Sequence, residues 1–540
     1  MDLDYVHRCK RNIKIEELLI NLEATLCHKY KIVPTLEGRI KVFFMQNFSF
    51  FNLGIILGLF ILNIACTSLQ KEIKQKPNIL FLFADDQRAD ALGIASNPYI
   101  KTPNIDNLAK GGTRFLNSYV MGGHHGAICA PSRAMLLSGK SLFHVYDRLD
   151  GVNTLPKYLN NFGYETFATG KWHNGASSFE SNFQQGKQIM LGGMSDHFEV
   201  PVRNLDNKQK LSAPQKKGYS TDLFADAALE FLDRYKDSGK QDPFFCYIAF
   251  TAPHDPRSPA LNYSNAYAKD EIPLPANFSP LHPFRFDDFN VRDETLAPWP
   301  RTPEVIQSSL AEYYALIQHI DDRVGDLISR LEKHELLDNT LIIYTADNGL
   351  ALGSHGLLGK QNLYEHSTKV PLIISGPGLP KGQTSEALVY LFDLFPTLVD
   401  YLDYPMPEQI DGKSLMKIIK GSENQVRNSL YTSYRNTVRA VRDQEWKLIR
   451  YPQIDVTQLF HLKKDPHELH DLAENPEYFS KVNDLMSCLN EHRLATEDTI
   501  NMNPKYFEEK VYDYKKLVQK LDPWQPSYII EKYFPKGTRR

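Results

Sequence analysis

The stretch Asn78-Ile-Leu-Phe-Leu-Phe-Ala84-Asp85-Asp86 decides the fold of this chain. A continuous apolar run, rather than an alternating one, is typical of a strand that is buried on both faces of a parallel sheet. The run ends in two adjacent carboxylates, which are costly beside a buried strand unless a cation neutralises them. Ligands of open α/β sheets bind at this carboxyl edge. The stretch therefore predicts an α/β fold with a cation site where its first strand ends, although a solvated turn is the alternative.

Polar side chains follow other strands of the same kind. The stretches Glu165–Thr169, Pro243–Phe250 and Thr340–Thr345 are also predicted to be buried strands. Together with the first strand, they are followed by Asp85 and Asp86, by Lys171 and His173, by His254, and by Asp347 and Asn348. Because the carboxyl ends of parallel strands meet at one edge of a sheet, we expect these residues to form one site. Lys171 and His173 are two positions apart, so they would face the same way on an extended segment.

The stretch Cys129-Ala-Pro-Ser-Arg133 is the most unusual one in the chain. We expect a helix over Arg133–Ser138, which would place Cys129 just before the helix N-terminus. That position favours a developing negative charge. The glycine-rich approach Gly122–Gly126 contains His124 and His125, which would either meet a substrate anion or coat the loop. The alternative for Cys129 is a buried core cysteine.

A change in strand pattern predicts two folded domains. Over residues 76–420, buried strands alternate with amphipathic helices such as Ser220–Lys236 and Ser308–His334, as in a doubly wound α/β fold whose large mixed sheet is sandwiched by helices. Over residues 421–540, short alternating strands predict a smaller C-terminal α+β subdomain built on an antiparallel sheet. Residues 176–220 and 258–305 show no clear periodicity. We expect them to be irregular excursions that cover the site.

The first 75 residues differ in kind from the rest. Phe43–Ile64 is apolar, and its best run, Leu53–Leu62, has the size of a signal-peptide core. Ile64-Ala-Cys66 resembles a lipoprotein cleavage box, in which Cys66 would be lipidated. We expect Met45 to be the working start and the protein to be exported, as a periplasmic, outer-membrane or cell-surface protein. A single membrane anchor is the alternative.

Composition narrows the class of protein further. A chain of 540 residues, 42% hydrophobic and 24% charged, fits a soluble body with one large and one smaller domain. Its net charge of −3 provides no global basic field, so we expect no nucleic acid partner. Of its six cysteines, only Cys246 and Cys488 remain in the exported body once Cys66 and Cys129 are assigned. We therefore expect no disulfide framework.

Six short motifs, taken in order, resemble those of the type I sulfatases of the alkaline phosphatase superfamily. They are Asp-Asp at 85–86, Cys-Ala-Pro-Ser-Arg at 129–133, Gly-Lys-Trp-His at 170–173, Pro-His at 253–254, Asp-Asn-Gly at 347–349 and Gly-Lys at 359–360. Each motif is weak alone, but their joint order is specific. The resemblance runs from about Pro77 to Leu472 and implies a sulfuric ester hydrolase.

The resemblance also implies a modified residue and a metal. In this family the cysteine at the position of Cys129 is oxidised to formylglycine by a maturation enzyme, and the hydrated aldehyde attacks sulfur. One Ca²⁺ would be held by Asp85, Asp86, Asp347 and Asn348, together with the modified Cys129. The remaining implied roles belong to Arg133 (orienting the nucleophile), His173 (deprotonating or holding it), Lys171 and Lys360 (binding sulfate oxygens), and His254 (protonating the leaving oxygen).

The chain departs from the commonest pattern in small ways. Asn174 follows His173 where Leu is usual, and Ser138 stands where Thr is frequent. The form Pro253-His-Asp-Pro-Arg257 resembles the iduronate-2-sulfatase-like branch. Arg257 is a candidate for contact with a substrate carboxylate, and a structural surface arginine is the alternative.

Analogy within the family suggests the substrate class. We expect a sulfated polysaccharide or its oligosaccharides, from which inorganic sulfate is released, with an algal polymer such as ulvan first and a glycosaminoglycan next. A phosphodiesterase or phosphonate hydrolase of the same superfamily is one alternative. A catalytically inactive, carbohydrate-binding relative is the other.

Overall fold

The computed structural model describes residues 76–286, 291–516 and 525–534. The predicted signal segment Phe43–Ile64, the start at Met45 and the lipidation of Cys66 lie outside these residues. All of the described residues belong to one compact unit. Among them, none of the helices has the length and apolar character needed to cross a membrane.

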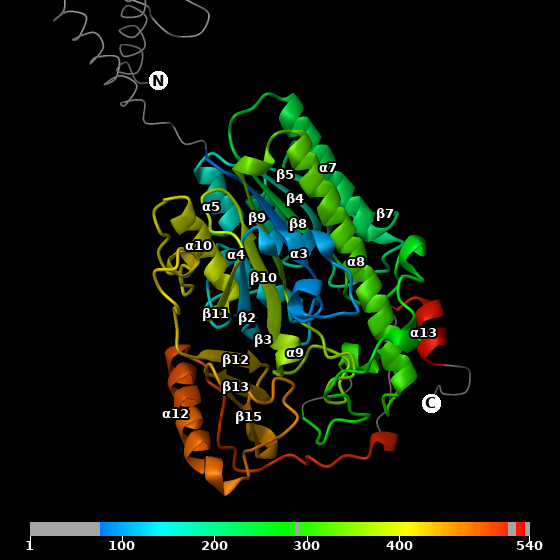
Figure 1. The fold of residues 1–540 in the computed structure, drawn as a ribbon, viewed down its shortest axis with the longest axis vertical. Helices are drawn as coiled ribbons and strands as arrows, with labels where there is room; N and C mark the ends of the chain where they lie inside the picture. Colours follow the sequence, from blue (N-terminus) through cyan, green and yellow to red (C-terminus); the bar gives the residue numbers. More distant parts are fainter. Residues whose placement is uncertain (1–75, 287–290, 517–524, 535–540) are drawn as a thin grey trace, which may run out of the picture. The chain divides into compact units, whose positions relative to one another are not determined.

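The core is an eight-stranded sheet with the strand order β11-β2-β10-β9-β1-β8-β4-β5 (Figure 1). β1 (Asn78–Ala84) is buried along its whole length and pairs in parallel with β9 (Thr340–Ala346) and β8 (Phe244–Ala249). β8 in turn pairs in parallel with β4 (Glu165–Lys171). Four adjacent strands therefore run the same way and end at one edge. This confirms the predicted parallel core.

The outer strands make the sheet mixed. β10 (Lys369–Ser375) runs antiparallel to both β9 and β2 (Thr113–Tyr119), and β11 (Gln383–Tyr390) forms one edge. The expectation that residues 176–220 are irregular was wrong. They contain α6, β5, β6 and β7, which span Ala176–Asn182, Gln185–Met190, Val200–Val202 and Gln215–Lys217. β5 forms the other edge of the large sheet, so part of it is solvent-facing and polar, and this hides its strand character in the sequence.

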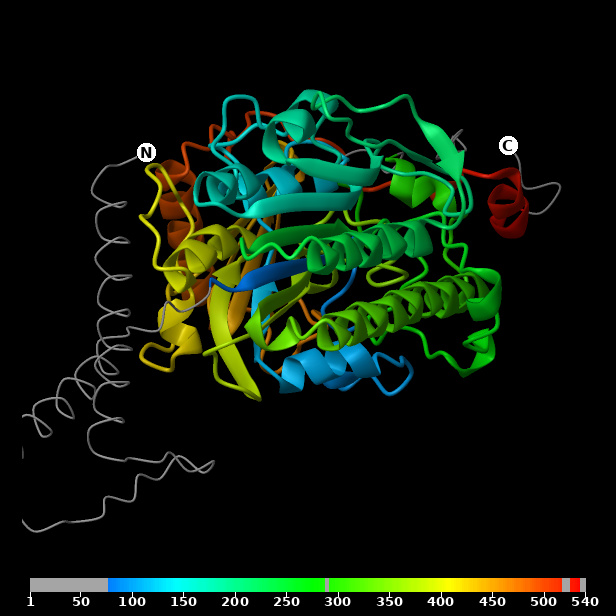
Figure 2. The same ribbon diagram turned by 90° about the horizontal axis from the view of Figure 1, so that it is seen from above.

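Helices cover both faces of the large sheet (Figures 1 and 2). α3, α7 and α8 contact one another in series on one face, and α5, α4 and α10 do so on the other. In that order they span Pro103–Lys110, Ser220–Asp237, Pro303–Lys333, Leu155–Asn161, Cys129–Ser138 and Leu394–Tyr401. The shorter helices α9 and α11 span Glu365–Thr368 and Met416–Ile419. These layers confirm the predicted sandwich of helices around the sheet.

A smaller five-stranded sheet has the order β15-β14-β13-β12-β3. Four antiparallel strands come from the C-terminal part, as predicted, and span Leu430–Tyr434, Val438–Arg442, Trp446–Tyr451 and Val456–His461 for β12 to β15. The fifth, β3 (Gly122–Gly123), pairs in parallel with β12 and belongs to the segment that leads to Cys129. α12 (Phe479–Ala495) packs on this sheet. The C-terminal part is thereby joined directly to the approach of Cys129.

Short 3₁₀ turns and one C-terminal helix complete the described residues. The turns η1 to η9 span Gly93–Ala95, Leu261–Tyr263, Lys269–Glu271, Arg292–Leu296, Leu337–Asn339, Leu391–Asp393, Pro452–Ile454, Pro476–Tyr478 and Tyr514–Lys516. α13 (Ser527–Tyr533) packs near α8, where the hydroxyl of Tyr533 donates to Glu312 Oε2 at 2.8 Å. The described residues of the excursion over 258–305 therefore contain η2, η3 and η4 but no strand or α-helix before α8 begins at Pro303.

Candidate active site

Three carboxylates meet where β1 and β9 end. The backbone N–H of Asp85 donates to the carbonyl of Ala252 at 3.1 Å, and that of Asp347 donates to Ala84 at 3.2 Å. Asp86 has a left-handed backbone with a φ of 67°, and its N–H donates to Asp347 Oδ1 at 3.0 Å. All three carboxylates are fully buried. The structure thus brings together the acidic pairs that the sequence places at two separate strand ends.

Cys129 lies beside these carboxylates. Its Sγ is 3.3 Å from Asp85 Oδ1 and 3.6 Å from Asp86 Oδ1, and the ammonium of Lys360 donates to it at 2.8 Å. Cys129 is the first residue of α4, whereas the sequence prediction started the helix at Arg133. The helix starts earlier because proline is well tolerated in a first turn, which is where Pro131 stands. The alternative of a cysteine in an apolar core does not fit these polar contacts.

Three buried cations balance the three carboxylates. Lys171 Nζ lies 2.5 Å from Asp85 Oδ2, and Lys360 Nζ lies 2.7 Å from both oxygens of Asp86. Arg133 places its Nε and one Nη at 2.9 Å from Asp347 Oδ2, and its other Nη donates to the Lys171 carbonyl at 2.7 Å. The side chain of each of these cations is at most 2% exposed. Such a concentration of buried charge is costly for stability and is characteristic of functional sites.

Burial changes the protonation of this cluster. It raises the pKa of Asp85 to about 6, with a further contribution from Asp347, and it raises the pKa of Asp86 well above its ordinary value. Burial acts in the same direction on Asp347, but Arg133, Lys171 and Lys360 outweigh it and hold the pKa of that carboxyl below its usual range. Burial, followed by Asp347 and Asp85, raises the pKa of the Cys129 thiol. Because burial disfavours the ionised carboxylates, a bound cation would stabilise their charged forms.

The donor set of the cluster suits a metal ion of a particular kind. Ligand atoms of Asp85, Asp86, Cys129 and His254 all lie within 4.8 Å of one another. Asn348, next to Asp347, is buried, and its amide nitrogen has no hydrogen-bond partner among the described residues. Carboxylate and amide oxygens are the ligands of hard cations such as Ca²⁺, for which a thiol is a poor ligand. The set therefore fits a hard cation best when residue 129 offers oxygen rather than sulfur.

His254 follows β8 and borders the cluster from another side. Its Nε2 lies 3.6 Å from Asp86 Oδ2, and its Nδ1 lies 2.8 Å from the carbonyl oxygen of Asp255. The Asp255 carboxylate receives two hydrogen bonds from Arg292, at 2.8 and 2.9 Å, and one from Gln525 at 2.7 Å. Burial, followed by Lys360 and Lys171, lowers the pKa of His254 well below its ordinary value. The imidazole is thus held by Asp255, which is itself held from two distant segments.

The turn η4 contributes residues that the sequence did not single out. Asp293 Oδ2 accepts from the amide of Gln361 at 2.7 Å, and the Glu294 carboxylate accepts from the backbone N–H of Leu358 at 3.0 Å and of Gly359 at 2.8 Å. Arg292 from the same turn binds Asp255, as above. Three successive charged residues therefore connect His254 to the loop that carries Lys360. The only sequence signal for them was the expectation that residues 258–305 cover a site.

His173 and Asn174 lie in a turn that follows β4 rather than in the strand itself. β4 ends at Lys171, and His173 has a φ of 65°, so the argument that the two side chains face the same way on an extended segment was wrong. Burial, followed by Lys171 and Arg133, lowers the pKa of His173, and its Nδ1 has no hydrogen-bond partner among the described residues. Asn174 donates to the carbonyl of Ala130 at 2.9 Å, which ties this turn to α4. Asn174, which stands where leucine is usual in the family, therefore has a structural role at this position.

Among the described residues, no hydrogen bond or ion pair joins the predicted substrate-binding side chains to the buried cluster. His124 and His125 are exposed, and His125 pairs with Asp147 at 2.5 Å, which raises its pKa. Arg257 is only 4% exposed, so the alternative of a surface arginine was wrong. Its Nε has no hydrogen-bond partner among the described residues, and no ion pair to them is observed. A guanidinium in this state can accept an anion from outside the chain.

Comparison with known protein families agrees with this geometry. The family described as Sulfatase matches residues 77–404, and the one described as N-sulphoglucosamine sulphohydrolase, C-terminal, matches residues 353–495. The chain belongs to the sulfatase family. It is accordingly a sulfuric ester hydrolase. The first match covers every strand end that contributes to the site, and the second continues into the smaller sheet.

Individual sulfatases resemble the chain along most of its length. An N-acetylglucosamine-6-O-sulfatase of Bacteroides thetaiotaomicron is 28% identical over 518 residues, which cover 80% of this chain and 89% of the relative. The N-acetylglucosamine-6-sulfatase of Homo sapiens is 30% identical over 400 residues, with 68% and 69% covered. An ulvan-active sulfatase of Formosa agariphila is 26% identical over 492 residues, with 84% and 88% covered.

Solved structures share the fold of this sulfatase. One, a complex with its substrate D-glucosamine-2-N,6-O-disulfate, has a TM-score of 0.67 and 26% identity and covers 78% of this chain and 99% of that one. A phosphonate monoester hydrolase of Agrobacterium radiobacter has a TM-score of 0.62 at 21% identity, with 81% and 100% covered. The second likeness concerns the fold alone. The shared fold therefore does not by itself separate sulfate ester from phosphonate chemistry.

Proposed function

We propose that this sulfatase hydrolyses sulfate esters on a sulfated polysaccharide or its oligosaccharides and releases inorganic sulfate. The observation that carries the proposal is the placement of Cys129, inside a complete Cys-Ala-Pro-Ser-Arg motif, against Asp85, Asp86 and Lys360. Relatives named for amino-sugar 6-sulfates and for ulvan support a carbohydrate substrate. An algal polymer such as ulvan is the first candidate and a glycosaminoglycan the second.

The proposal includes a modified Cys129 and a Ca²⁺ ion. Asp85, Asp86, Asp347 and Asn348 would hold the ion, which supplies neutralisation of the buried carboxylates and polarisation of a sulfate oxygen. Formylglycine at residue 129, made by a maturation enzyme, supplies an oxygen nucleophile. The raised pKa of the thiol supports this modification, because a protonated buried thiol is neither a nucleophile nor a ligand for a hard cation.

The basic residues of the cluster then have distinct tasks. The ammonium of Lys360 contacts residue 129, and that of Lys171 contacts Asp85, the neighbour of residue 129, so both suit the binding of sulfate oxygens. Arg133 is fixed by Asp347 and by the Lys171 carbonyl, and it would orient the nucleophile. His173 holds a neutral imidazole, because burial lowers its pKa, and it would accept the proton of the nucleophile.

His254 is the residue that we assign to the leaving group. Its Nδ1 is engaged by Asp255, so its Nε2 is the ring atom that faces the cluster. Because Nδ1 must donate to the Asp255 carbonyl, a proton on Nε2 makes an imidazolium, which burial, Lys360 and Lys171 oppose in the free protein. A bound sulfate would offset the charge of the two lysines and favour that form, and the Nε2 proton would then pass to the departing sugar oxygen. Asp255 would stabilise the imidazolium form and fix the orientation of the ring, as a carboxylate does for other catalytic histidines.

Mass spectrometry of the peptide that contains Cys129 tests the proposed modification. Conversion of the thiol to an aldehyde lowers the mass by about 18 Da. We expect this change in protein from the native host or from a host that expresses the maturation enzyme. An unmodified cysteine in native protein would instead favour the inactive, carbohydrate-binding alternative.

A substrate comparison tests the second candidate function, a phosphodiesterase or phosphonate hydrolase. The structural likeness to a phosphonate monoester hydrolase is the observation that keeps this candidate. Matured protein should cleave an aryl sulfate with a higher kcat/KM than an aryl phosphodiester or phosphonate monoester. A preference for either phosphorus ester would overturn our choice.

The location and the substrate detail form further parts of the proposal. We propose export to the periplasm, outer membrane or cell surface, with attachment through a lipidated Cys66. Membrane fractionation of the native host, with and without Cys66→Ala, checks this. Arg257 is buried and forms no ion pair with the described residues, which supports contact with a substrate carboxylate, as in the iduronate-2-sulfatase-like branch. If so, Arg257→Lys should raise KM for uronate-containing substrates and leave KM for neutral aryl sulfates unchanged.

A further inference from the structure

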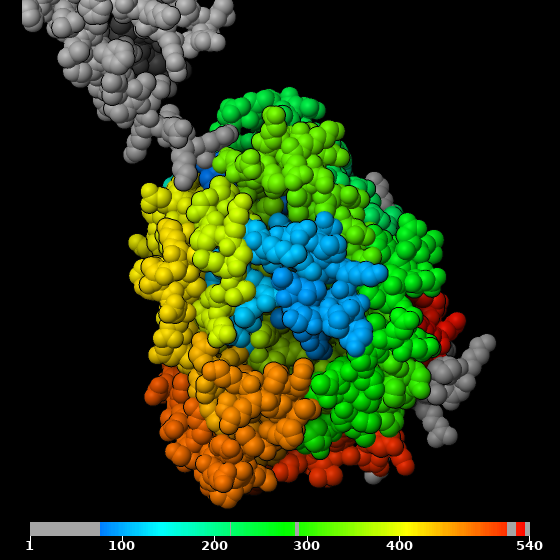
Figure 3. All heavy atoms as spheres, viewed as in Figure 1, coloured from blue at the N-terminus to red at the C-terminus, as the bar shows by residue number. Residues whose placement is uncertain are grey.

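A cavity of about 710 Å³ lies between the large sheet and the smaller one, apart from the active site. None of Asp85, Cys129, His254 or Lys360 lines it. Its walls come from β2 and β10 of the large sheet, from the loop that follows β1, and from the C-terminal part around residues 442–468. These segments, blue, yellow-green and orange, meet on the face shown in Figure 3. The volume is in the range of pockets that hold small organic ligands, which is roughly 300–1,000 Å³.

The lining of this cavity carries five cationic side chains and four carboxylates, and two of the cations form no ion pair with the described residues. The ammonium group of Lys369 on β10 makes no hydrogen bond or ion pair with the described residues, and the guanidinium of Arg114 on β2 donates to the carbonyl of Ile94 and forms no ion pair with them. The other arginines of the lining are paired, Arg88 with Asp90 and Arg442 with Glu365. Burial lowers the pKa of both Lys369 and Arg114, and the nearby carboxylates, Glu365 for Lys369 and Asp106 for Arg114, offset this shift only in part. The cavity therefore has capacity for added negative charge.

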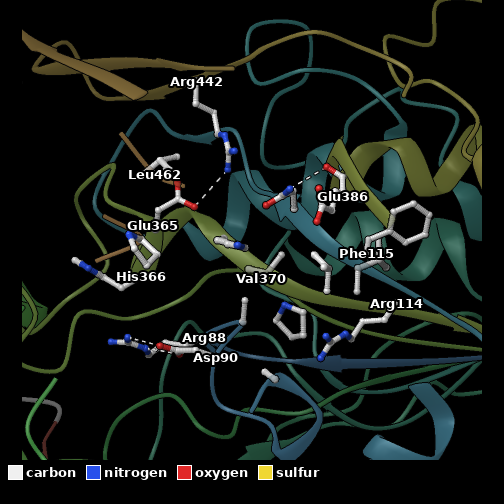
Figure 4. A pocket seen from close by; sticks show the side chains of 18 of the residues that line it. Arg88, Asp90, Arg114, Phe115, Glu365, His366, Val370, Glu386, Arg442 and Leu462 are labelled. Atoms are coloured by element: carbon white, nitrogen blue, oxygen red, sulfur yellow. Dashed lines mark hydrogen bonds and ion pairs between the residues drawn. The ribbon is translucent and has the colours of Figure 1, made fainter. Parts of the chain in front are cut away.

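The two unpaired cations stand well apart along the sheet. Arg114 lies opposite Ile373 in the antiparallel pair of β2 and β10, and Lys369 is four residues from Ile373 on the same strand. At 3.3 Å per residue, the two positions are about 13 Å apart along the strand direction. Figure 4 shows Arg114 at one end of the cavity, Val370 in its middle and Arg88 with Asp90 at the other end. A single inorganic anion cannot span this length, whereas a chain with repeated negative groups can.

The rest of the lining mixes apolar and hydrogen-bonding groups. Val370, Leu372 and Leu462 offer apolar surface, and the amides of Asn117, Asn277 and Gln444 offer donors and acceptors. His366 adds a buried imidazole whose two nitrogens have no hydrogen-bond partner among the described residues. A sugar ring presents apolar faces and hydroxyl edges, so this mixture suits a saccharide better than a purely apolar ligand.

We propose that this cavity is a second, non-catalytic binding site for an acidic oligosaccharide. Sulfate or carboxylate groups on successive sugars would pair with Lys369 and Arg114, and the sugar rings would lie over β10. The site goes beyond the proposed function and rests on it only for the choice of probe. It would allow the enzyme to hold one part of a polymer while another part occupies the active site.

Calorimetric titration of the full chain carrying Cys129→Ala tests this site without turnover. The probes are a heparin-derived hexasaccharide and, separately, inorganic sulfate. We expect Lys369→Gln with Arg114→Gln to abolish one class of hexasaccharide binding or to weaken it at least tenfold. Lys381→Gln, which removes an exposed charge just before β11 and does not line the cavity, should change nothing. Circular dichroism and a melting curve establish that each variant is folded.

Two outcomes overturn the proposal. Hexasaccharide binding that is identical in the double variant and in Lys381→Gln would show that the cavity takes no saccharide. Displacement of the hexasaccharide from the cavity by inorganic sulfate at equal concentration would assign the cavity to the free anion instead.

A kinetic measurement on matured enzyme separates this proposal from the proposed function. The double variant should keep the kcat/KM of the unaltered protein on 4-nitrophenyl sulfate and show a several-fold higher KM on a sulfated polymer. An equal KM on the polymer counts against the cavity. If the matured enzyme cleaves no sulfate ester at all, the proposed function fails, while the calorimetric result on the cavity still stands.

Discussion

Cys129 is the residue on which the proposed chemistry depends. Its thiol is buried, its pKa is raised, and its surroundings are oxygen ligands and an ammonium rather than apolar side chains. We therefore expect Cys129→Ala and Cys129→Ser to lower kcat on an aryl sulfate by at least a thousandfold. Because both replacements are small, the melting temperature should change by only a few degrees. Initial rates together with calorimetry check this, and wild-type activity in either variant would refute the assignment of the nucleophile.

The same residues predict a response to Ca²⁺ that is independent of activity. An ion bound only by the folded chain stabilises it by about 2.7 kcal/mol at a concentration of 100 times Kd. Addition of Ca²⁺ should therefore raise the melting temperature of the purified protein, and Asp86→Asn should abolish most of the increase. Asp90→Asn is the matched control, since Asp90 is four residues away and pairs with Arg88 at the surface. A shift of equal size in Asp86→Asn would show that the ion binds elsewhere.

At the scale of elements, the turn η4 acts as a brace between His254 and Lys360, the two groups to which we assign proton donation and sulfate binding. Arg292 holds Asp255 behind His254, while Asp293 and Glu294 hold the loop that bears Lys360. Arg292→Gln should loosen His254 and so impair protonation of the leaving group. A leaving group of low pKa needs no proton. We therefore expect kcat to fall about tenfold or more on a sugar sulfate and much less on 4-nitrophenyl sulfate.

The control for this brace is Arg323→Gln. Arg323 lies on α8 and pairs with Asp226 and Asp326, far along the chain from η4. The Arg323→Gln substitution should leave kcat unchanged on both the sugar sulfate and 4-nitrophenyl sulfate. An equal loss on both substrates in Arg292→Gln would indicate general disturbance of the site rather than loss of a proton donor.

The elements nearest the site were the most predictable from sequence. β1, β8 and β9 are buried along their whole length, so their apolar runs are unbroken and their polar ends are conspicuous. The edge strands β5 and β11 were missed because their partly or fully exposed positions carry polar residues, such as the half-buried Gln185 and the exposed Glu386. The brace was also missed, because its contacts join residues that lie tens of positions apart in irregular chain, where no periodicity operates. The residue types at strand ends were thus enough to predict the candidate site. The contacts that hold its side chains in place join distant parts of the chain and are visible only in the structure.

At the scale of the whole molecule, one buried lysine joins the smaller sheet to the larger one. Lys447 on β14 lies 3.1 Å from Glu365 and 2.9 Å from Glu468. Glu365 also receives Arg442 and Tyr119, so it keeps its charge. Burial raises the pKa of Glu468 to about 7 from an ordinary value of 4.5. Of the two carboxyls that share the lysine, Glu468 is therefore the one that takes up a proton.

This proton makes stability depend on pH in a defined direction. Between pH 4.5 and about 7 the folded chain binds more protons at Glu468 than the unfolded chain does, so the contribution of this group to stability is full below pH 4.5 and is lost as the pH rises through 7. Glu468→Gln removes the titrating carboxyl and therefore removes this loss of stability at higher pH. The melting temperature of the variant relative to wild type should rise from pH 5 to pH 8, whereas the exposed Glu474→Gln should follow wild type throughout. A constant difference for Glu468→Gln would contradict the assignment.

Gly122 is the point at which the smaller sheet reaches the approach to Cys129. It pairs with Ser433 across β3 and β12 and has a φ of 106°, which side chains rarely adopt. A Cβ at this position would overlap the carbonyl oxygen of Ser433. Gly151 also has a positive φ, of 70°, but a Cβ there meets nothing within 4 Å. Gly151→Ala should therefore cost only the backbone strain, about 1–2 kcal/mol.

Gly122→Ala should cost more, because the overlap with backbone cannot be relieved without separating β3 from β12. We expect urea denaturation to show a clearly larger loss of unfolding free energy than in Gly151→Ala, and we expect activity to fall as well, since Cys129 follows β3 by only a few residues. If the two variants lose equal stability and Gly122→Ala retains full activity, the smaller sheet does not hold the nucleophile segment in place.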